Sequence, residues 1–137
     1  MRSLDSLIRL HKWQLEEKRR ALGALQGLRA DLTRQADELE REVLREQDTA
    51  AHSTEAGWTY SGYARAVIRR RENLRRSIAE VDKKIDTATD EVRVAHREMR
   101  KYETAEERAQ QRADAEEARR DQIELDEIAS NQQRQRR

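Results

Sequence analysis

Apolar residues recur through the first half of the chain at alternating spacings of three and four. This is the heptad pattern of a helix that packs against another helix along a narrow seam. It predicts a long helix over about residues 3–51. The heptad positions of this half, most of them apolar, are Leu4, Ile8, His11, Leu15, Lys18, Leu22, Leu25, Arg29, Leu32, Ala36, Leu39, Val43, Glu46 and Ala50.

The second half repeats the pattern with fewer interruptions, and its register does not slip. A period of 3.5 residues kept over this length implies left-handed supercoiling of the helices. The pattern predicts a second helix over about residues 62–129. Its heptad positions are Ala64, Val67, Arg71, Leu74, Ile78, Val81, Ile85, Ala88, Val92, Ala95, Met99 and Tyr102.

The segment between the two patterns, residues 52–61, predicts a turn. It contains poor helix formers and Gly57, it is followed by Gly62, and Ser61 is a suitable N-cap for the second helix. A parallel dimer of one continuous helix and a larger bundle would also bury the seam, but this stop and restart favours an antiparallel hairpin. We therefore predict an all-α fold, with two long helices forming an antiparallel coiled-coil hairpin.

The predicted hairpin has unequal arms. Folding about Gly57 places residue i opposite roughly residue 115 − i, so Leu39 lies near Leu74 or Arg75 and Leu15 near Met99 or Arg100. The first helix then reaches only to about residue 112, and the second helix overhangs it by roughly 25 Å at 1.5 Å per residue. Residues 130–137 are expected to form a frayed basic tail.

Composition supports a rod made of one domain over residues 1–137. Charged residues make up 42% of the chain and hydrophobic residues 35%, and Phe and Pro are absent, so a multilayered core is excluded. The chain has 29 basic and 28 acidic residues, which argues against a dedicated nucleic-acid binder. It has no cysteine, a charged start and no long apolar run, so we expect a cytoplasmic protein without membrane insertion.

Residues suited to catalysis are scattered along the helices. His11, His52 and His96 have no second ligand one turn away, and a rod offers no concave site in which a nucleophile and a base could meet. We therefore expect no enzyme activity, no metal and no cofactor, and we interpret the chain as a binding protein.

Trp13 and Leu10 fall outside the seam, three residues apart on the outward face of the first helix. The tryptophan either lies flat over Leu10 and neighbouring side chains or anchors a partner, because Trp is enriched at the centres of interfaces.

The predicted turn contains Trp58 and Tyr60 and is followed by Tyr63, which together are three of the five aromatics of the chain. They either close the end of the seam or take part in recognition. The arginine-rich run 69–76 follows, and it is a solvated face, a docking site for an acidic protein or a site for nucleic acid.

The block Ser3–Arg20 (SLDSLIRLHKWQLEEKRR), followed by a long charged helix, an aromatic turn and a longer second helix, resembles the flagellar export protein FliJ family over the whole chain. The resemblance implies a component of the flagellar type III export apparatus, needed for flagellum assembly and motility. It implies a stalk in the pore of the export ATPase hexamer that contacts the membrane export gate and assists export chaperones. The implied location is the cytoplasmic face of the inner membrane, at the flagellar basal body.

Two sets of contact residues follow from the overhang, the tip and the resemblance. Tyr63 matches an aromatic of the family early in the second helix and Val67 follows one turn later, whereas Glu46 and Ala50 depart from the bulkier residues expected opposite them. The set expected at the ATPase ring is Leu4, Leu7, Leu10, Trp13, Ile123, Leu125 and Ile128; the set expected at the export gate is Trp58, Tyr60, Tyr63, Val67, Arg69 and Arg70. The stalk is expected to be a monomer in isolation, and the alternative is a structural coiled-coil adaptor or homodimer without an ATPase partner.

Overall fold

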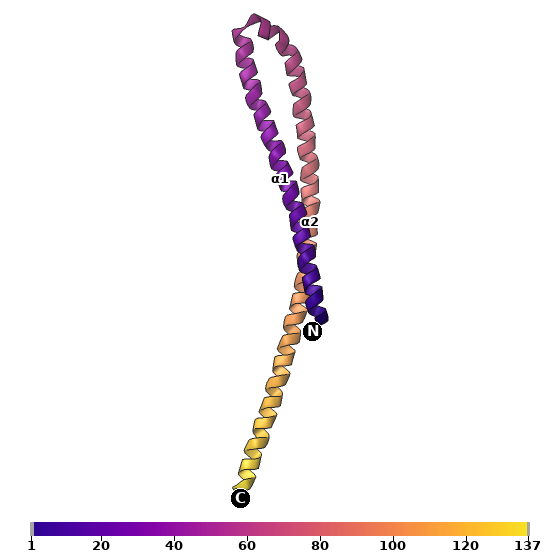
Figure 1. The fold of residues 1–137 in the computed structure, drawn as a ribbon, viewed down its shortest axis with the longest axis vertical. Helices are drawn as coiled ribbons and strands as arrows, with labels where there is room; N and C mark the ends of the chain where they lie inside the picture. The colour runs from indigo at the N-terminus through magenta and orange to yellow at the C-terminus, as the bar shows by residue number, and fades with distance from the viewer. Residues whose placement is uncertain (1, 137) are drawn as a thin grey trace. The chain divides into compact units, whose positions relative to one another are not determined.

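The computed structural model describes residues 2–136 as two long helices (Figure 1). Helix α1 spans Arg2–His52 and helix α2 spans Thr54–Gln135, and no strand occurs among the residues described. The chain divides into two compact units, which we describe separately. The hairpin unit is Gln14–Ala95, and the terminal unit combines Met1–Trp13 with His96–Arg137. The all-α prediction is confirmed, and the assignment of one domain to residues 1–137 stays a prediction.

The turn is much shorter than the sequence predicted. Only Ser53 separates the helices, and its carbonyl accepts the first hydrogen bond of α2 from the Gly57 N–H at 3.0 Å, which makes Ser53 the N-cap. The predicted turn over residues 52–61 and the N-cap at Ser61 are therefore wrong. Gly57 and Gly62 lie inside α2 without positive φ, because an interior glycine costs a helix only about 1 kcal/mol.

The predicted frayed tail is also wrong over most of its length, since α2 continues to Gln135. No proline or glycine follows Gly62, so nothing in the sequence ends the helix earlier. Arg134 lies in the last turn, where a positive charge is favourable to the helix dipole.

The core of the hairpin unit follows the predicted seam. In Figure 1 the two helices of this unit run side by side from the tip. Leu39, Val43, Val67 and Leu74 form a buried cluster, as expected for Leu39 beside Leu74. Every buried apolar residue of the unit occupies a predicted heptad position: Leu15, Leu39, Val43, Val67, Leu74, Val81 and Ala88.

Three basic residues interrupt the seam of the hairpin unit, and each pairs with an acidic residue of the other helix. The Lys18 ammonium lies 3.2 Å from Glu91. The Arg29 guanidinium lies 2.5 Å from Asp82, and Arg71 donates to both carboxylate oxygens of Glu40 at 2.5 and 2.7 Å. These hydrogen bonds raise the pKa of each arginine and lower that of Glu40. The charged seam positions therefore show which residues of the two helices lie at the same height.

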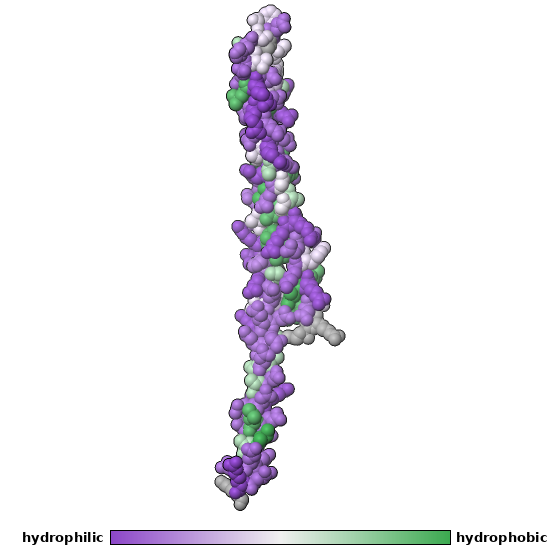
Figure 2. All heavy atoms as spheres, turned by 60° about the vertical axis from the view of Figure 1, so that its left-hand side comes forward, coloured by the Kyte–Doolittle hydropathy of each residue, from purple (hydrophilic) through white to green (hydrophobic). Residues whose placement is uncertain are grey.

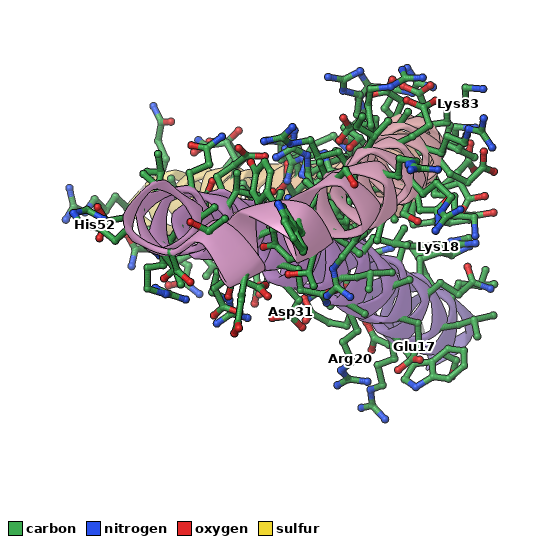
Figure 3. The ribbon with its side chains drawn as sticks, turned by 90° about the horizontal axis from the view of Figure 1, so that it is seen from above. Glu17, Lys18, Arg20, Asp31, His52 and Lys83 are labelled. Carbon is green, nitrogen blue, oxygen red and sulfur yellow. The ribbon has the colours of Figure 1, made fainter. Side chains whose placement is uncertain are left out.

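These pairs also test the predicted register. Arg29 pairs with Asp82 and Arg71 with Glu40, so the residue numbers of each pair add up to 111, close to the predicted 115. The other charged side chains of the unit point outward (Figure 3), where Glu17 and Arg20 form an ion pair within one helix and Lys83 extends away from the ribbon. Such exposed pairs contribute little to stability.

In the terminal unit α1 packs on only a short part of α2. Ile8 is buried, the ring of His11 stacks on Tyr102 with centroids 4.5 Å apart, and the Lys12 ammonium lies 4.0 Å from Glu103. From residue 110 to residue 136 only Glu116 is even half-buried. This exposed length matches the predicted overhang of the second helix. None of the helices described contains an apolar stretch long enough to cross a membrane.

Candidate functional site

An exposed apolar stripe lies on α1 in the terminal unit. Leu7, Leu10 and Trp13 follow one another at spacings of three residues, and their exposed fractions rise from 38% to 47% and 61%. Three residues fall about 60° short of a full turn, so each step turns further from the seam. Leu4 stands at a heptad position and is half-buried. The predicted outward position of Trp13 is confirmed.

The C-terminal part of α2 has a second set of exposed apolar residues. Ile123, Leu125 and Ile128 are 46%, 60% and 47% exposed. Leu125 and Ile128 are three residues apart and share a face, whereas Ile123 lies about 140° or more away around the helix. The C-terminal end of α2 shows a small hydrophobic patch on a hydrophilic surface in Figure 2. The sequence predicted these residues as one group, and the helix presents them on two faces.

The aromatic residues near the tip separate into exposed and packed ones. Trp58 is 80% exposed, so it does not close the seam. Tyr63 packs against the buried cluster and lies 5.9 Å from the ring of Tyr60. Its hydroxyl is buried and has no hydrogen-bond partner among the residues described; burial, followed by the charges of Glu42 and Glu46, raises its pKa. Tyr63 therefore has the packing role, and Trp58 is available to a partner.

The remaining residues predicted at the gate end are also divided. Val67 is only 5% exposed, so its predicted place in a contact surface is wrong; it faces the other helix because it occupies a heptad position. Arg69 and Arg70 are exposed, and neither forms an ion pair with any residue described. Trp58, Arg69 and Arg70 are thus the accessible members of this set.

The other arginines of the run 69–76 are paired. Arg75 donates to both oxygens of Glu72 at 2.9 and 2.5 Å, and Arg76 donates to the same carboxylate at 3.1 Å. These bonds, those from Arg75 first, lower the pKa of Glu72 to about 2. Much of the positive charge of the run is therefore compensated within the chain.

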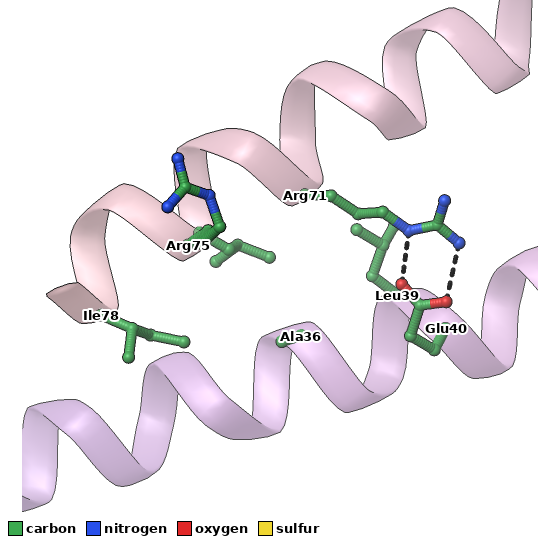
Figure 4. A pocket seen from close by; sticks show the side chains of 7 residues that line it. Ala36, Leu39, Glu40, Arg71, Arg75 and Ile78 are labelled. Atoms are coloured by element: carbon green, nitrogen blue, oxygen red, sulfur yellow. Dashed lines mark hydrogen bonds and ion pairs between the residues drawn. The ribbon is translucent and has the colours of Figure 1, made fainter.

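A groove opens between the helices of the hairpin unit beside the pair formed by Arg71 and Glu40 (Figure 4). Apolar side chains of the seam form its floor, and charged side chains stand at its edge. The lining residues are Ala36, Leu39, Glu40, Arg71, Leu74, Arg75 and Ile78.

The terminal unit contains a group of carboxylates where α1 meets α2. A hydrogen bond to the Asp5 side chain, burial and the charge of Asp5 together raise the pKa of Glu106. Glu103 adds to this rise, and Lys12 opposes it. Within residues 2–136, no group of three or more His, Cys, Asp or Glu side chains is placed to hold a metal ion.

Sequence reasoning missed four large apolar residues that are exposed in the described part of the hairpin unit: Leu28, Leu44, Ile68 and Val94. Leu44 and Ile68 are the most exposed of the four. Leu44 is 66% exposed and Ile68 is 62% exposed. Each directly follows a buried heptad residue, Val43 or Val67, so each lies about 100° around its helix from the seam. That offset is visible in the sequence and could have identified both.

The comparisons with known proteins agree with the architecture. The family model described as flagellar FliJ protein matches residues 1–137, the full length of the chain. No match was found among curated proteins or among solved structures. The helical hairpin, the exposed apolar stripe and a family match over the whole length lead to one conclusion: the chain belongs to the flagellar FliJ family and is a component of flagellar protein export.

Proposed function

We propose that the chain is the central stalk of the hexameric export ATPase, links that ring to the membrane export gate and assists the traffic of export chaperones. The observation that supports the proposal is the stripe of Leu7, Leu10 and Trp13, which stays exposed in the terminal unit. Apolar side chains grouped on a surface mark a contact with another protein, and Trp is common where such contacts are strongest. The stalk works at the cytoplasmic face of the inner membrane, at the flagellar basal body.

The two sets of contact residues are assigned to different partners. The exposed members of the ring set, including Ile123, Leu125 and Ile128 on α2, enter the ATPase ring. The accessible tip residues Trp58, Arg69 and Arg70 face the export gate. In this proposal the chain has no catalytic residue of its own, and it acts by changing the activity of the ATPase.

The experiment measures ATP hydrolysis by the cognate export ATPase with each variant added. Trp13→Ala is expected to reduce stimulation, because truncation of an interface anchor commonly costs about 2 kcal/mol or more of binding free energy. Truncation after Arg120 removes the three exposed apolar residues of α2 and is expected to reduce stimulation as well.

The matched control is Leu28→Ala. Leu28 is 46% exposed and lies in the hairpin unit, so it resembles the ring-set residues in chemistry but belongs to neither contact set. Its stimulation should equal that of the unchanged protein, and thermal melts of all three variants should agree within a few degrees. A protein that neither binds nor stimulates the ATPase would contradict the stalk and favour an adaptor without an ATPase partner.

A further inference from the structure

One face of the hairpin unit presents two stripes of opposite charge, each with an exposed apolar residue between charged ones. The members of each stripe follow at spacings of three or four residues, so successive members are neighbours on the surface of their helix. We name this surface the Leu44–Ile68 face. Its α1 stripe is Asp37, Glu40, Leu44 and Asp48, and its α2 stripe is Arg65, Ile68, Arg71 and Arg75.

The ion pair between Arg71 and Glu40 shows that both stripes lie on the same side of the hairpin, since one member comes from each stripe (Figure 4). It also sets their relative height. Leu44 is four residues after Glu40 and Ile68 is three residues before Arg71, so in antiparallel helices these two apolar residues stand at nearly the same height.

The charged residues match in height by the same argument. Asp37 lies one turn from Glu40 on the side away from the tip, as Arg75 does from Arg71. Asp48 and Arg65 lie on the tip side of Leu44 and Ile68, one turn beyond each. Along the face, each stripe therefore has an apolar residue with charged residues on both sides of it. The charges are negative on α1 and positive on α2.

Several residues of the face have no counterpart within their own chain. Leu44 and Ile68 are 66% and 62% exposed. Asp37 and Arg65 form no ion pair with any residue that the structure describes. Arg75 and Arg76 both pair with Glu72, so one carboxylate compensates the charge of two arginines only in part. The face offers both apolar area and charge to a partner.

We propose that two copies of the chain associate through the Leu44–Ile68 face, with a two-fold axis parallel to the helices. A half-turn about such an axis keeps every height unchanged and places α1 of each copy against α2 of the other. Leu44 then meets Ile68 of the second copy. On either side of this contact, Asp37 meets Arg75 and Asp48 meets Arg65, so the interface is self-complementary, as a two-fold interface requires.

The charges of the two stripes favour a second copy of the chain as the partner and a two-fold axis parallel to the helices. Residues 36–51 contain six acidic and two basic residues, whereas residues 64–78 contain six basic and one acidic. A two-fold axis across the helices would place α1 on α1 and bring like charges together. A single helix of one charge from another protein would attract one stripe and repel the other. Only a second hairpin supplies both signs at matching heights.

The resulting assembly is a four-helix arrangement in which each helix runs antiparallel to both neighbours, a geometry that coiled-coil packing favours. The contact is short and its centre contains two apolar pairs, so it falls among small, transient interfaces. We therefore expect association that depends on protein concentration and leaves the monomer available to other partners.

Cysteine cross-linking tests the geometry directly, because the native chain has no cysteine. A mixture of Leu44→Cys and Ile68→Cys chains should form a disulfide-linked dimer on mild oxidation. Each variant alone should cross-link several-fold less, because identical positions lie diagonally across the assembly, beyond the reach of a disulfide. The control mixture is Leu28→Cys with Val94→Cys, which are 46% and 48% exposed and precede a heptad position, so they lie on the other side of the hairpin.

Charge exchange tests the complementarity. Sedimentation of the unchanged protein over an about 100-fold range of concentration should show the mass rising from monomer toward dimer. A variant with Asp37→Arg and Asp48→Arg, and another with Arg65→Asp and Arg75→Asp, should each stay monomeric. Their equimolar mixture should regain a dimer containing one of each, and thermal melts would show that both variants remain folded.

Three results would overturn the proposal. They are a constant monomer mass over the whole range, cross-linking of positions 44 and 68 no greater than in the control mixture, and a mixture of the two charge variants that stays monomeric. If the protein stays monomeric and Leu44→Glu instead weakens binding to the ATPase or the export gate, the face belongs to that partner. The cross-linking and sedimentation measurements need no ATPase, so they fail or succeed independently of the proposed stalk function.

Discussion

The hairpin unit and the terminal unit are built from the same two helices, but they treat apolar residues differently. In the hairpin unit seven seam positions, among them Leu15 and Ala88, are buried. In the terminal unit Ile8 is the only buried apolar residue among those described, whereas Trp13 and Leu125 are about half exposed or more. A helix without a partner cannot bury its apolar side chains. The hairpin unit thus has the residues of a stabilising core, and the terminal unit has those of a contact surface.

The largest expected effect comes from placing a charge in each unit. Val81→Asp buries a carboxylate in the seam of the hairpin unit, where Val81 is 5% exposed, and should cost about 3–5 kcal/mol of unfolding free energy. Ile128→Asp makes the same kind of change at a residue that is 47% exposed in the terminal unit and should cost within about 0.5 kcal/mol. Circular dichroism melts measure both. Equal losses would contradict the difference between the units.

A smaller effect is expected from local helix propensity. Gly62 lies inside α2, and a methyl group added there would meet no atom within 4 Å. Gly62→Ala should therefore stabilise the hairpin unit by about 1 kcal/mol, because alanine is the better helix former. Ala118→Gly, on the exposed part of α2, should lower helical content locally without changing the main transition. A loss of stability in Gly62→Ala would instead place residue 62 in a turn.

The smallest effect concerns pH and distinguishes the units by sign. The folded pKa of Glu106 is raised above 4.5, chiefly by its hydrogen bond to Asp5, so the folded terminal unit holds this proton more tightly than the unfolded chain does. Its packing should therefore strengthen as pH falls from 7 toward 4.5. The pKa of Glu72 in the hairpin unit is lowered to about 2, so its contribution is lost only as pH falls below 4.5.

The measurement uses a Trp58→Phe chain, in which Trp13 is the remaining tryptophan and reports on the terminal unit. Thermal unfolding followed by its fluorescence should shift to a higher temperature at pH 5 than at pH 7. Glu106→Gln should remove most of this shift and stabilise the unit at pH 7. A shift of the same size in Glu106→Gln would assign the effect to another group.

The tip of the hairpin unit is where the turn predicted from the sequence was wrong. Two glycines and a serine near residues 57–62 predicted a turn, yet the boundary between the helices lies at Ser53. A glycine inside a helix costs about 1 kcal/mol relative to alanine, and a serine that caps a helix contributes a similar amount. Local preferences of this size do not decide a boundary, and the packing of Val43 and Val67 in one cluster limits where the helices can reverse.

The sequence by itself determined that the protein is two long helices and which residues face the seam. Apolar residues that recur every 3.5 residues are removed from water when two helices pack along them. It also placed Trp13 outside the seam. Only the tertiary structure decided that Val67 is core and not contact surface, that Leu125 and Ile123 face different ways, and that Leu44 and Ile68 stand at one height on one face. These facts depend on how two helices are aligned, and the alignment is set by long-range packing such as that of Val43 and Val67 in one cluster, which no local pattern specifies.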